Sequence, residues 1–140
     1  MMLNVETELL IAKTPAEVFE AWVDPAKMAR YFISSGTGRM EAGKTVVWSW
    51  GDVGAEASVK VLEVEPARRL KFIWAGFGME STVEATFEPK DGGTRVAVRE
   101  GAWEGDEGGI RRYGQQMQGW VNMLLCLKAH LVFDVDLRRG

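Results

Sequence analysis

The 140-residue sequence contains one cysteine, one histidine and four prolines, and it has no long apolar run. A single cysteine excludes an internal disulfide and a cysteine-rich metal site. No stretch approaches the roughly 20 apolar residues of a membrane-spanning helix. The net charge of −3 provides no broad attraction to nucleic acid. The first residues lack the basic and apolar regions of a signal peptide, so we expect a cytoplasmic protein.

The same scarcity limits the catalytic chemistry. Neither His130 nor Cys126 has helical or strand neighbours that would complete a Ser-His-Asp or Cys-His set. We interpret Cys126 as a small core residue, and His130 as a structural or solvated residue near a helix C-terminus that favours its charged form. The acidic residues 104–107 lack EF-hand spacing, so we predict no metal and no cofactor. The sequence thus favours a non-enzymatic protein while leaving catalysis open.

The composition, 46% hydrophobic and 26% charged, is that of an ordinary soluble domain. The length fits one domain, which we expect to span residues 1–140. Tryptophan is abundant, with six residues in this small chain. Most of these tryptophans stand at alternating or helical positions, and we predict that they point inward together.

A long helix is predicted over residues 109–133. Apolar residues recur there at spacings of three and four, as on one face of a helix: Ile110, Tyr113, Met117, Trp120, Leu124, Leu127 and Leu131. Gly114 and Gly119 lie inside this helix, where each costs about 1 kcal/mol relative to Ala. Either another element approaches the helix closely at these glycines, or they leave room beside Trp120.

The segments before this helix alternate with the period of strands. Strands are predicted at residues 3–11, 45–50, 57–64, 70–74, 79–88 and 96–98, with turns at 51–54, 65–68, 75–78 and 90–93. A change of parity predicts a β-bulge near Val61. A capping box of Thr14 and Glu17 starts one short helix, and Asp24-Pro25 starts a second over residues 25–32.

Residues 34–38 are predicted as a loop, and residues 101–109 as a glycine-rich acidic loop. Strands followed by a helix indicate an α+β fold rather than α/β. We predict a curved antiparallel sheet of about six to seven strands around the long C-terminal helix, because this arrangement buries both apolar faces.

Four stretches resemble motifs of one family. Residues 15–25 carry Pro-x-x-Val-Phe-x-Ala-Trp-x-Asp-Pro, and residues 63–70 carry Glu-Val-x-Pro-x-x-Arg-Leu. Residues 93–96 resemble the start of that family's last strand, and residues 119–127 carry Gly-Trp-x-x-x-Leu-x-x-Leu. The family is the AHSA1-like family (activator of Hsp90 ATPase homologue) of the START-like, or SRPBCC, superfamily. The resemblance implies a helix-grip fold, often with an apolar cavity between helix and sheet.

The aromatic residues suggest where that cavity lies. Trp48 and Trp50 share one strand face, Phe72 and Trp74 share another, and Trp120 projects from the helix. A filled core and a ligand cavity are both open interpretations, and the resemblance favours the cavity. The residues predicted to line it are Phe19, Trp22, Trp48, Trp50, Val59, Phe72, Trp74, Val83, Tyr113, Met117, Trp120 and Leu124. The polar candidates are Ser58, Ser81, Glu100, Tyr113 and Gln116, and the strand parity near Gly101 leaves the direction of Glu100 open.

The leading hypothesis is a binding module for a small hydrophobic or aromatic ligand, lipid-like or polyketide-like, held between the long helix and the sheet. Family members also include cyclases and lipid or steroid carriers, so fold alone does not decide function. One alternative is a protein-interaction module acting on an Hsp90-type ATPase, as the family name implies. Another is a cyclase or hydrolase using Glu100, Tyr113 or Gln116 in the same cavity. Contact with a chaperone or a second copy stays open.

Overall fold

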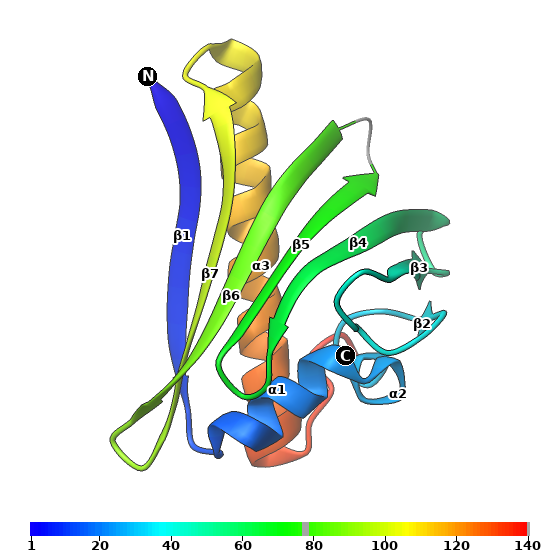
Figure 1. Cartoon of the computed structure of the whole chain (residues 1–140), viewed down its shortest axis with the longest axis vertical. Coiled ribbons are helices and arrows are strands. Elements are labelled where there is room, and N and C mark those ends of the chain that lie inside the picture. Colours follow the sequence, from blue (N-terminus) through cyan, green and yellow to red (C-terminus); the bar gives the residue numbers. More distant parts are fainter. Residues whose placement is uncertain (77–78, 140) are drawn as a thin grey trace.

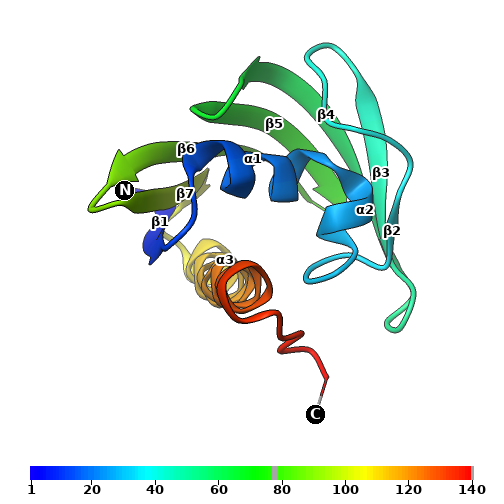
Figure 2. The same cartoon turned by 90° about the horizontal axis from the view of Figure 1, so that it is seen from below.

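A computed structural model of the chain describes residues 1–76 and 79–139. Seven strands form one antiparallel sheet in the order β1-β7-β6-β5-β4-β3-β2. The strands are β1 (Met2–Ile11), β2 (Ser35–Gly36), β3 (Thr45–Trp50), β4 (Ala55–Glu65), β5 (Arg69–Gly76), β6 (Met79–Lys90) and β7 (Gly93–Glu104). The sheet curves around helix α3 (Glu107–Phe133), as Figures 1 and 2 show. The predicted α+β helix-grip fold is confirmed.

Two short helices, α1 (Pro15–Val23) and α2 (Pro25–Met28), close one end of this arrangement (Figure 2). The predicted capping box at α1 is present: the backbone N–H of Glu17 donates to Thr14 Oγ1 (3.2 Å), and the backbone N–H of Thr14 donates to Glu17 Oε1 (3.3 Å). Asp24 caps α2 by accepting from the N–H of Ala26 (2.9 Å). Local capping chemistry therefore fixes where both helices begin.

Three boundaries differ from the prediction. Helix α2 ends at Met28 rather than Phe32, and the predicted loop 34–38 contains the short strand β2, which pairs with β3. The last strand continues to Glu104, because β1 offers it partners as far as Met2. Asp106 then caps α3 by accepting from the N–H of Gly109 (2.8 Å). The predicted turn at 75–78 falls partly on residues 77–78, outside the described residues.

Two irregularities in the sheet set which side chains face inward. The register of β4 against β5 shifts between Val61 and Glu63, which confirms the predicted bulge. The register of β1 against β7 also shifts, because Asn4 pairs with Gly101 and Leu3 pairs with Trp103. The extra residue in β7 lets Glu100 and Trp103 both point into the core, although they lie an odd number of positions apart.

Aromatic rings fill the space where α1, α3 and the sheet meet. Trp22 stacks on Trp120 with ring centroids 5.9 Å apart, and Phe19 and Trp22 each form a T-shaped pair with Phe87. The apolar stripe of α3 faces this core, with one exception. Ile110 is 56% exposed because the first turn of α3 projects beyond the end of β7 (Figure 1).

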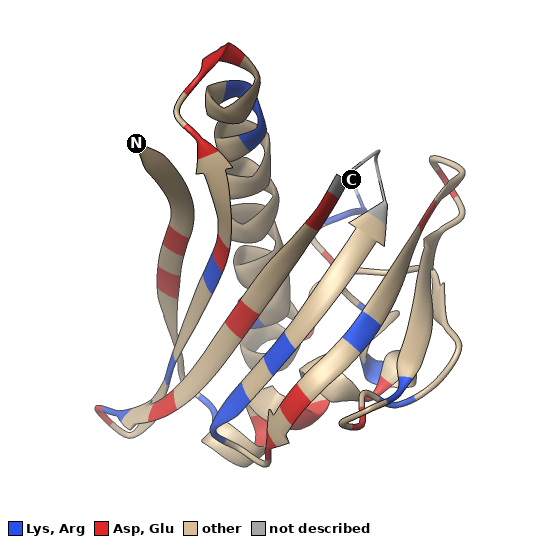
Figure 3. Ribbon diagram, turned by 45° about the horizontal axis from the view of Figure 1, so that its top comes forward, with Lys and Arg blue, Asp and Glu red and all other residues tan. Residues whose placement is uncertain are grey.

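The outer face of the sheet is charged. Arg69 pairs with Glu84 (2.7 Å) and Glu63 (3.0 Å), and Arg99 pairs with Glu6 (2.8 Å). Figure 3 shows residues of both signs spread along these strands. This face is therefore solvated and balanced in charge, which directs attention to the inner face. Within the described residues, no helix combines the length and the apolar character needed to cross a bilayer.

Candidate functional site

A pocket of about 250 Å³ opens between α3 and the sheet. Its walls come from six parts of the fold: the segment after α2, strands β3, β4 and β5, the turn between β3 and β4, and the middle of α3. The lining residues are Phe32, Trp50, Val53, Ala55, Trp74, Gln116, Gly119 and Trp120. Trp120 is buried, whereas Val53 and Gly119 are exposed, so the pocket reaches from the surface to the core.

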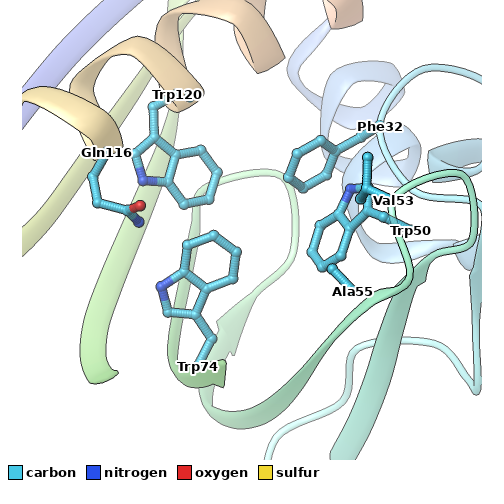
Figure 4. Close-up of a pocket in the computed structure, with 8 residues that line it drawn as sticks. Phe32, Trp50, Val53, Ala55, Trp74, Gln116 and Trp120 are labelled. Carbon is cyan, nitrogen blue, oxygen red and sulfur yellow. The ribbon is translucent and has the colours of Figure 1, made fainter. Parts of the chain in front are cut away.

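Aromatic rings make up most of these walls. Figure 4 shows Trp74 and Trp120 on one side of the pocket and Phe32 and Trp50 on the other. The ring centroids of Trp74 and Trp120 are 5.2 Å apart, and those of Phe32 and Trp50 are 5.4 Å apart. Phe32 also approaches Trp120, at 6.2 Å. Such a site favours a flat or apolar ligand, because rings offer large contact areas at little entropic cost.

A fully buried carboxylate, Glu100 of β7, lies behind one wall of this pocket. The indole N–H of Trp74 donates to its Oε2 (2.6 Å), and that of Trp120 donates to its Oε1 (2.8 Å). The amide Nε2 of Gln116 donates to Oε1 (2.8 Å), and the Ser81 hydroxyl donates to Oε2. Strands β5, β6 and β7 and helix α3 are thus joined at one side chain.

This set of donors matches the ionised form of Glu100. An indole N–H can only donate, and an ionised carboxylate can only accept. The two tryptophans can only donate, and Gln116 and Ser81 also donate, so the two oxygens of Glu100 act as acceptors in all four contacts. Hydrogen bonds to a charged acceptor in a buried site are stronger than neutral ones. The carboxylate therefore fixes the tilt of both indoles and the direction of the Gln116 amide.

The two glycines of α3 are in open surroundings. A Cβ placed on Gly114 or on Gly119 would meet no heavy atom outside the helix within 4 Å. Close approach of another element, one of the two explanations from sequence, is therefore wrong for both positions. Gly119 lines the pocket next to Trp120, so at this position the second explanation, room beside the ring, agrees with the structure.

The predicted lining residues separate into three groups: those that line the pocket, those that are partly buried on α3, and those that are buried in the core. Trp50, Trp74 and Trp120 line the pocket. Tyr113 and Met117 are partly buried on α3, and the others are buried in the core: Phe19, Trp22, Trp48, Val59, Phe72, Val83 and Leu124. Among the polar candidates, Gln116, Ser81 and Glu100 come together, whereas Ser58 is exposed on β4.

The lining residues that sequence reasoning missed are Phe32, Val53, Ala55 and Gly119. The sequence pattern places Phe32 at the end of a predicted helix and Val53 in a predicted turn, where periodicity carries no information about side-chain direction. Glu100 is a polar candidate from the sequence, and the uncertain parity near Gly101 does not fix its direction. Extending the alternation of Val96 and Val98 by one step places it inward, as the structure does.

The backbone around Phe32 is hydrogen-bonded to an arginine in the C-terminal tail. The Arg138 guanidinium donates to the carbonyl oxygens of Ile33 (3.1 Å) and Ala29 (3.0 Å), on either side of Phe32. Asp136 accepts from Arg138 Nε (2.9 Å) and orients it. The hydrogen bonds that Arg138 donates to Asp136 hold the pKa of Asp136 well below its usual range. The tail beyond α3 thus acts on the pocket wall through one arginine.

The lone histidine and cysteine lie away from the pocket. His130 stacks on Tyr31 with ring centroids 5.9 Å apart. Burial, and then the charge of Arg30, lower the pKa of His130, so these effects outweigh the helix dipole that was expected to favour its charged form. Burial raises the pKa of the Cys126 thiol. Within the described part of the chain, no three His, Cys, Asp or Glu side chains gather as metal ligands would.

Comparison with known proteins agrees with this architecture. The sequence profile of the family described as "Activator of Hsp90 ATPase homolog 1-like protein" matches residues 12–132. The helix-grip fold and this match define the class of protein, and the chain belongs to the AHSA1-like family. No curated protein matches the chain with statistical significance.

Solved structures share the fold over most of the chain. The protein SSP2350 from Staphylococcus saprophyticus is 29% identical, with a TM-score of 0.87 over 97% of this chain and 96% of its own. DynU16, from the dynemicin biosynthetic locus, is 25% identical, with a TM-score of 0.82 over 91% of this chain and 46% of its own. The Aha1 dimer from Colwellia psychrerythraea is 18% identical, with a TM-score of 0.75 and 99% of each chain covered. This chain thus spans about half the length of DynU16.

Proposed function

We propose that the protein binds a small hydrophobic or aromatic molecule in the pocket between α3 and the sheet. The observation that carries the proposal is the set of four rings, Phe32, Trp50, Trp74 and Trp120, around a space of about 250 Å³. The walls of this pocket are rings that reach from the surface to the core, so they offer an apolar ligand a large contact area.

The size and chemistry of the pocket narrow the ligand class. The volume lies just below the about 300 Å³ at which pockets for drug-sized ligands begin. It suits a molecule of one or two rings, or a short alkyl chain, better than a long acyl chain. The similarity to DynU16, a protein of a biosynthetic locus, supports a ligand of the polyketide or aromatic type.

Binding rather than catalysis is the role that the site favours. Glu100, the one buried carboxylate among the described residues, is enclosed by four donors behind the pocket wall. A general acid or base must come within hydrogen-bond reach of the proton that it transfers. Reaching a ligand would require Glu100 to give up bonds from Trp74 and Trp120, which argues against the cyclase or hydrolase alternative.

The test is a titration with small neutral aromatic compounds such as naphthalene and indole. Tryptophan emission should change, and the melting temperature should rise with ligand concentration, because a ligand bound only to the folded state stabilises it. The variant Gly119→Leu places a side chain in the pocket and should abolish binding. Its matched control, Gly114→Leu, adds the same side chain to the same helix outside the pocket and should bind normally. Binding that survives Gly119→Leu would contradict the proposed site.

A second candidate, a protein-binding role on an Hsp90-type ATPase, is favoured by the family description and by exposed apolar residues on the outer side of α3. Val121 is 37% exposed and Leu125 is 43% exposed, one helical turn apart. The test is ATP hydrolysis by the chaperone with and without the protein. Stimulation that is lost in Leu125→Glu but kept in Gly119→Leu would assign this role to the helix surface rather than to the pocket.

A further inference from the structure

We infer that the pocket selects ligands that carry a positive charge, of the amine or quaternary ammonium class, on a small aromatic or alkyl body. This inference rests on the proposed function, since it names the chemistry of the molecule that the same pocket would take. Three observations carry it: the use of the wall's hydrogen-bond donors by Glu100, the ring faces, and the buried negative charge behind them.

The first observation concerns donors. A carboxylate or phosphate ligand needs N–H or O–H groups to replace its lost hydration. The indole N–H groups of Trp74 and Trp120 and the amide Nε2 of Gln116 all belong to lining residues, and all three donate to Glu100. Figure 4 shows both of these indole nitrogens directed toward the side of Gln116 and away from Phe32. This wall therefore holds its donors away from an anionic ligand.

The second observation concerns the rings. The face of an aromatic ring carries partial negative charge, and tryptophan attracts cations more strongly than phenylalanine or tyrosine does. Three tryptophans and Phe32 line this pocket. Such surroundings are the ones that recognise quaternary ammonium groups, because methyl groups bearing a diffuse positive charge pack against ring faces.

The third observation concerns Glu100 and Gln116. All four side chains that donate to Glu100 in the described structure are neutral, so its negative charge is solvated by hydrogen bonds and is not cancelled by them. Gln116 directs its NH₂ group toward Glu100, so its amide oxygen is the end of this lining side chain that does not bond the carboxylate. Because burial lowers the local dielectric constant, the charge of Glu100 acts more strongly on a charge in the pocket than it would in water.

The experiment compares three probes that share a benzyl body and differ only in the charge of a tetrahedral head group. Benzyltrimethylammonium is the cation, neopentylbenzene is the neutral isostere and benzylsulfonate is the anion. Binding is measured by tryptophan emission on the intact chain at low salt. The cation should bind at least tenfold more tightly than the anion, and more tightly than the neutral probe.

The variant Glu100→Gln assigns the effect to the buried charge. It should weaken binding of the cation about tenfold relative to the neutral probe. The control Glu6→Gln makes the same change in net charge at a carboxylate that is 66% exposed on β1, and it should leave the ratio unchanged. A cation preference that persists unaltered in Glu100→Gln would overturn the role of Glu100.

The wild-type comparison decides the inference even if Glu100→Gln does not fold. Equal binding of cation and anion, or tighter binding of the anion, would overturn it while neutral-probe binding kept the proposed function intact. Failure of all three probes to bind would overturn the proposed function, and this inference with it.

Discussion

Trp74 of β5 and Trp120 of α3 stand 5.2 Å apart between ring centroids, and both donate their indole N–H to the carboxylate of Glu100. One side chain of the sheet thereby sets the orientation of a ring on the sheet and a ring on the helix. The pocket wall that these rings form is fixed by hydrogen bonds in addition to packing. We therefore expect the stability of the fold and the proposed ligand selection both to depend on Glu100.

Replacing Glu100 by glutamine should destabilise the fold by about 2–4 kcal/mol. The amide offers one acceptor and brings an NH₂ group against donors that were bonded to the carboxylate, so buried donors lose partners. Urea unfolding followed by tryptophan emission measures the change. Glu6→Gln, on the solvated face, should cost no more than about 0.5 kcal/mol. An equal effect of the two substitutions would show that the buried network contributes nothing.

The open surroundings of the two helix glycines predict that alanine stabilises both positions. Gly114→Ala and Gly119→Ala should each raise the free energy of unfolding by up to about 1 kcal/mol, because alanine has the higher helix propensity and a Cβ meets no neighbouring atom. Thermal unfolding without ligand is the measurement. Only Gly119→Ala should also alter ligand affinity, since only this glycine lines the pocket. Destabilisation by either change would mean that the helix needs the flexibility of glycine there.

His130 should make stability depend on pH near neutrality. Its pKa is lowered in the folded state, so the unfolded chain binds a proton more readily. The stabilisation is fully present above the unfolded value of about 6.5 and decreases as the pH falls below it, toward the lower folded pKa. Unfolding in urea from pH 7.5 to 5.5 should show this loss in the wild type and a smaller loss in His130→Gln. Identical slopes of unfolding free energy against pH in the wild type and in His130→Gln would contradict this prediction. No other imidazole contributes to the difference, because His130 is the only histidine.

The contact of Arg138 with the segment around Phe32 predicts an effect on binding from outside the pocket. Arg138→Ala should weaken ligand affinity severalfold and cost about 1–2 kcal/mol of stability, because two backbone carbonyls lose a charged donor. Fluorescence titration and urea unfolding measure the two effects. Arg139→Ala is the matched control, since Arg139 is 87% exposed on its side chain and contacts Asp136 at 3.4 Å. Equal ligand affinities of Arg138→Ala and Arg139→Ala would show that the contact of Arg138 has no effect on the pocket.

The sequence predicted the architecture well because periodicity reports burial directly. The alternation of Met79 to Phe87 and the three-and-four spacing from Tyr113 to Leu127 each describe a face that the structure buries fully or partly, apart from positions whose side chains lie outside the description. The bulge near Val61 was visible for the same reason, as a change of parity. Ile110 matched the helical spacing but lies beyond the end of the sheet, and the end of a partner element leaves no mark on periodicity.

The site was less accessible to sequence reasoning. Periodicity separates inward from outward residues, and it cannot separate those that touch one another from those that face a void. Trp48 and Trp50 share a strand face, yet Trp48 is buried in the core and Trp50 lines the pocket. The inward direction of Trp103 depends on a bulge near Gly101 that is visible only once β1 is paired with β7. The four donors to Glu100 come from two strands and one helix, which only the tertiary fold brings together.

The hydrogen bonds from Trp74 and Trp120 to Glu100 have a consequence for spectroscopy. A proton held against a buried carboxylate is deshielded and exchanges slowly with solvent, so two of the six indole N–H resonances should stand downfield of the others in a proton–nitrogen correlation spectrum. The resonance of Trp74 belongs to the sheet, and that of Trp120 belongs to the helix. The two resonances therefore report separately on the two elements that enclose the pocket.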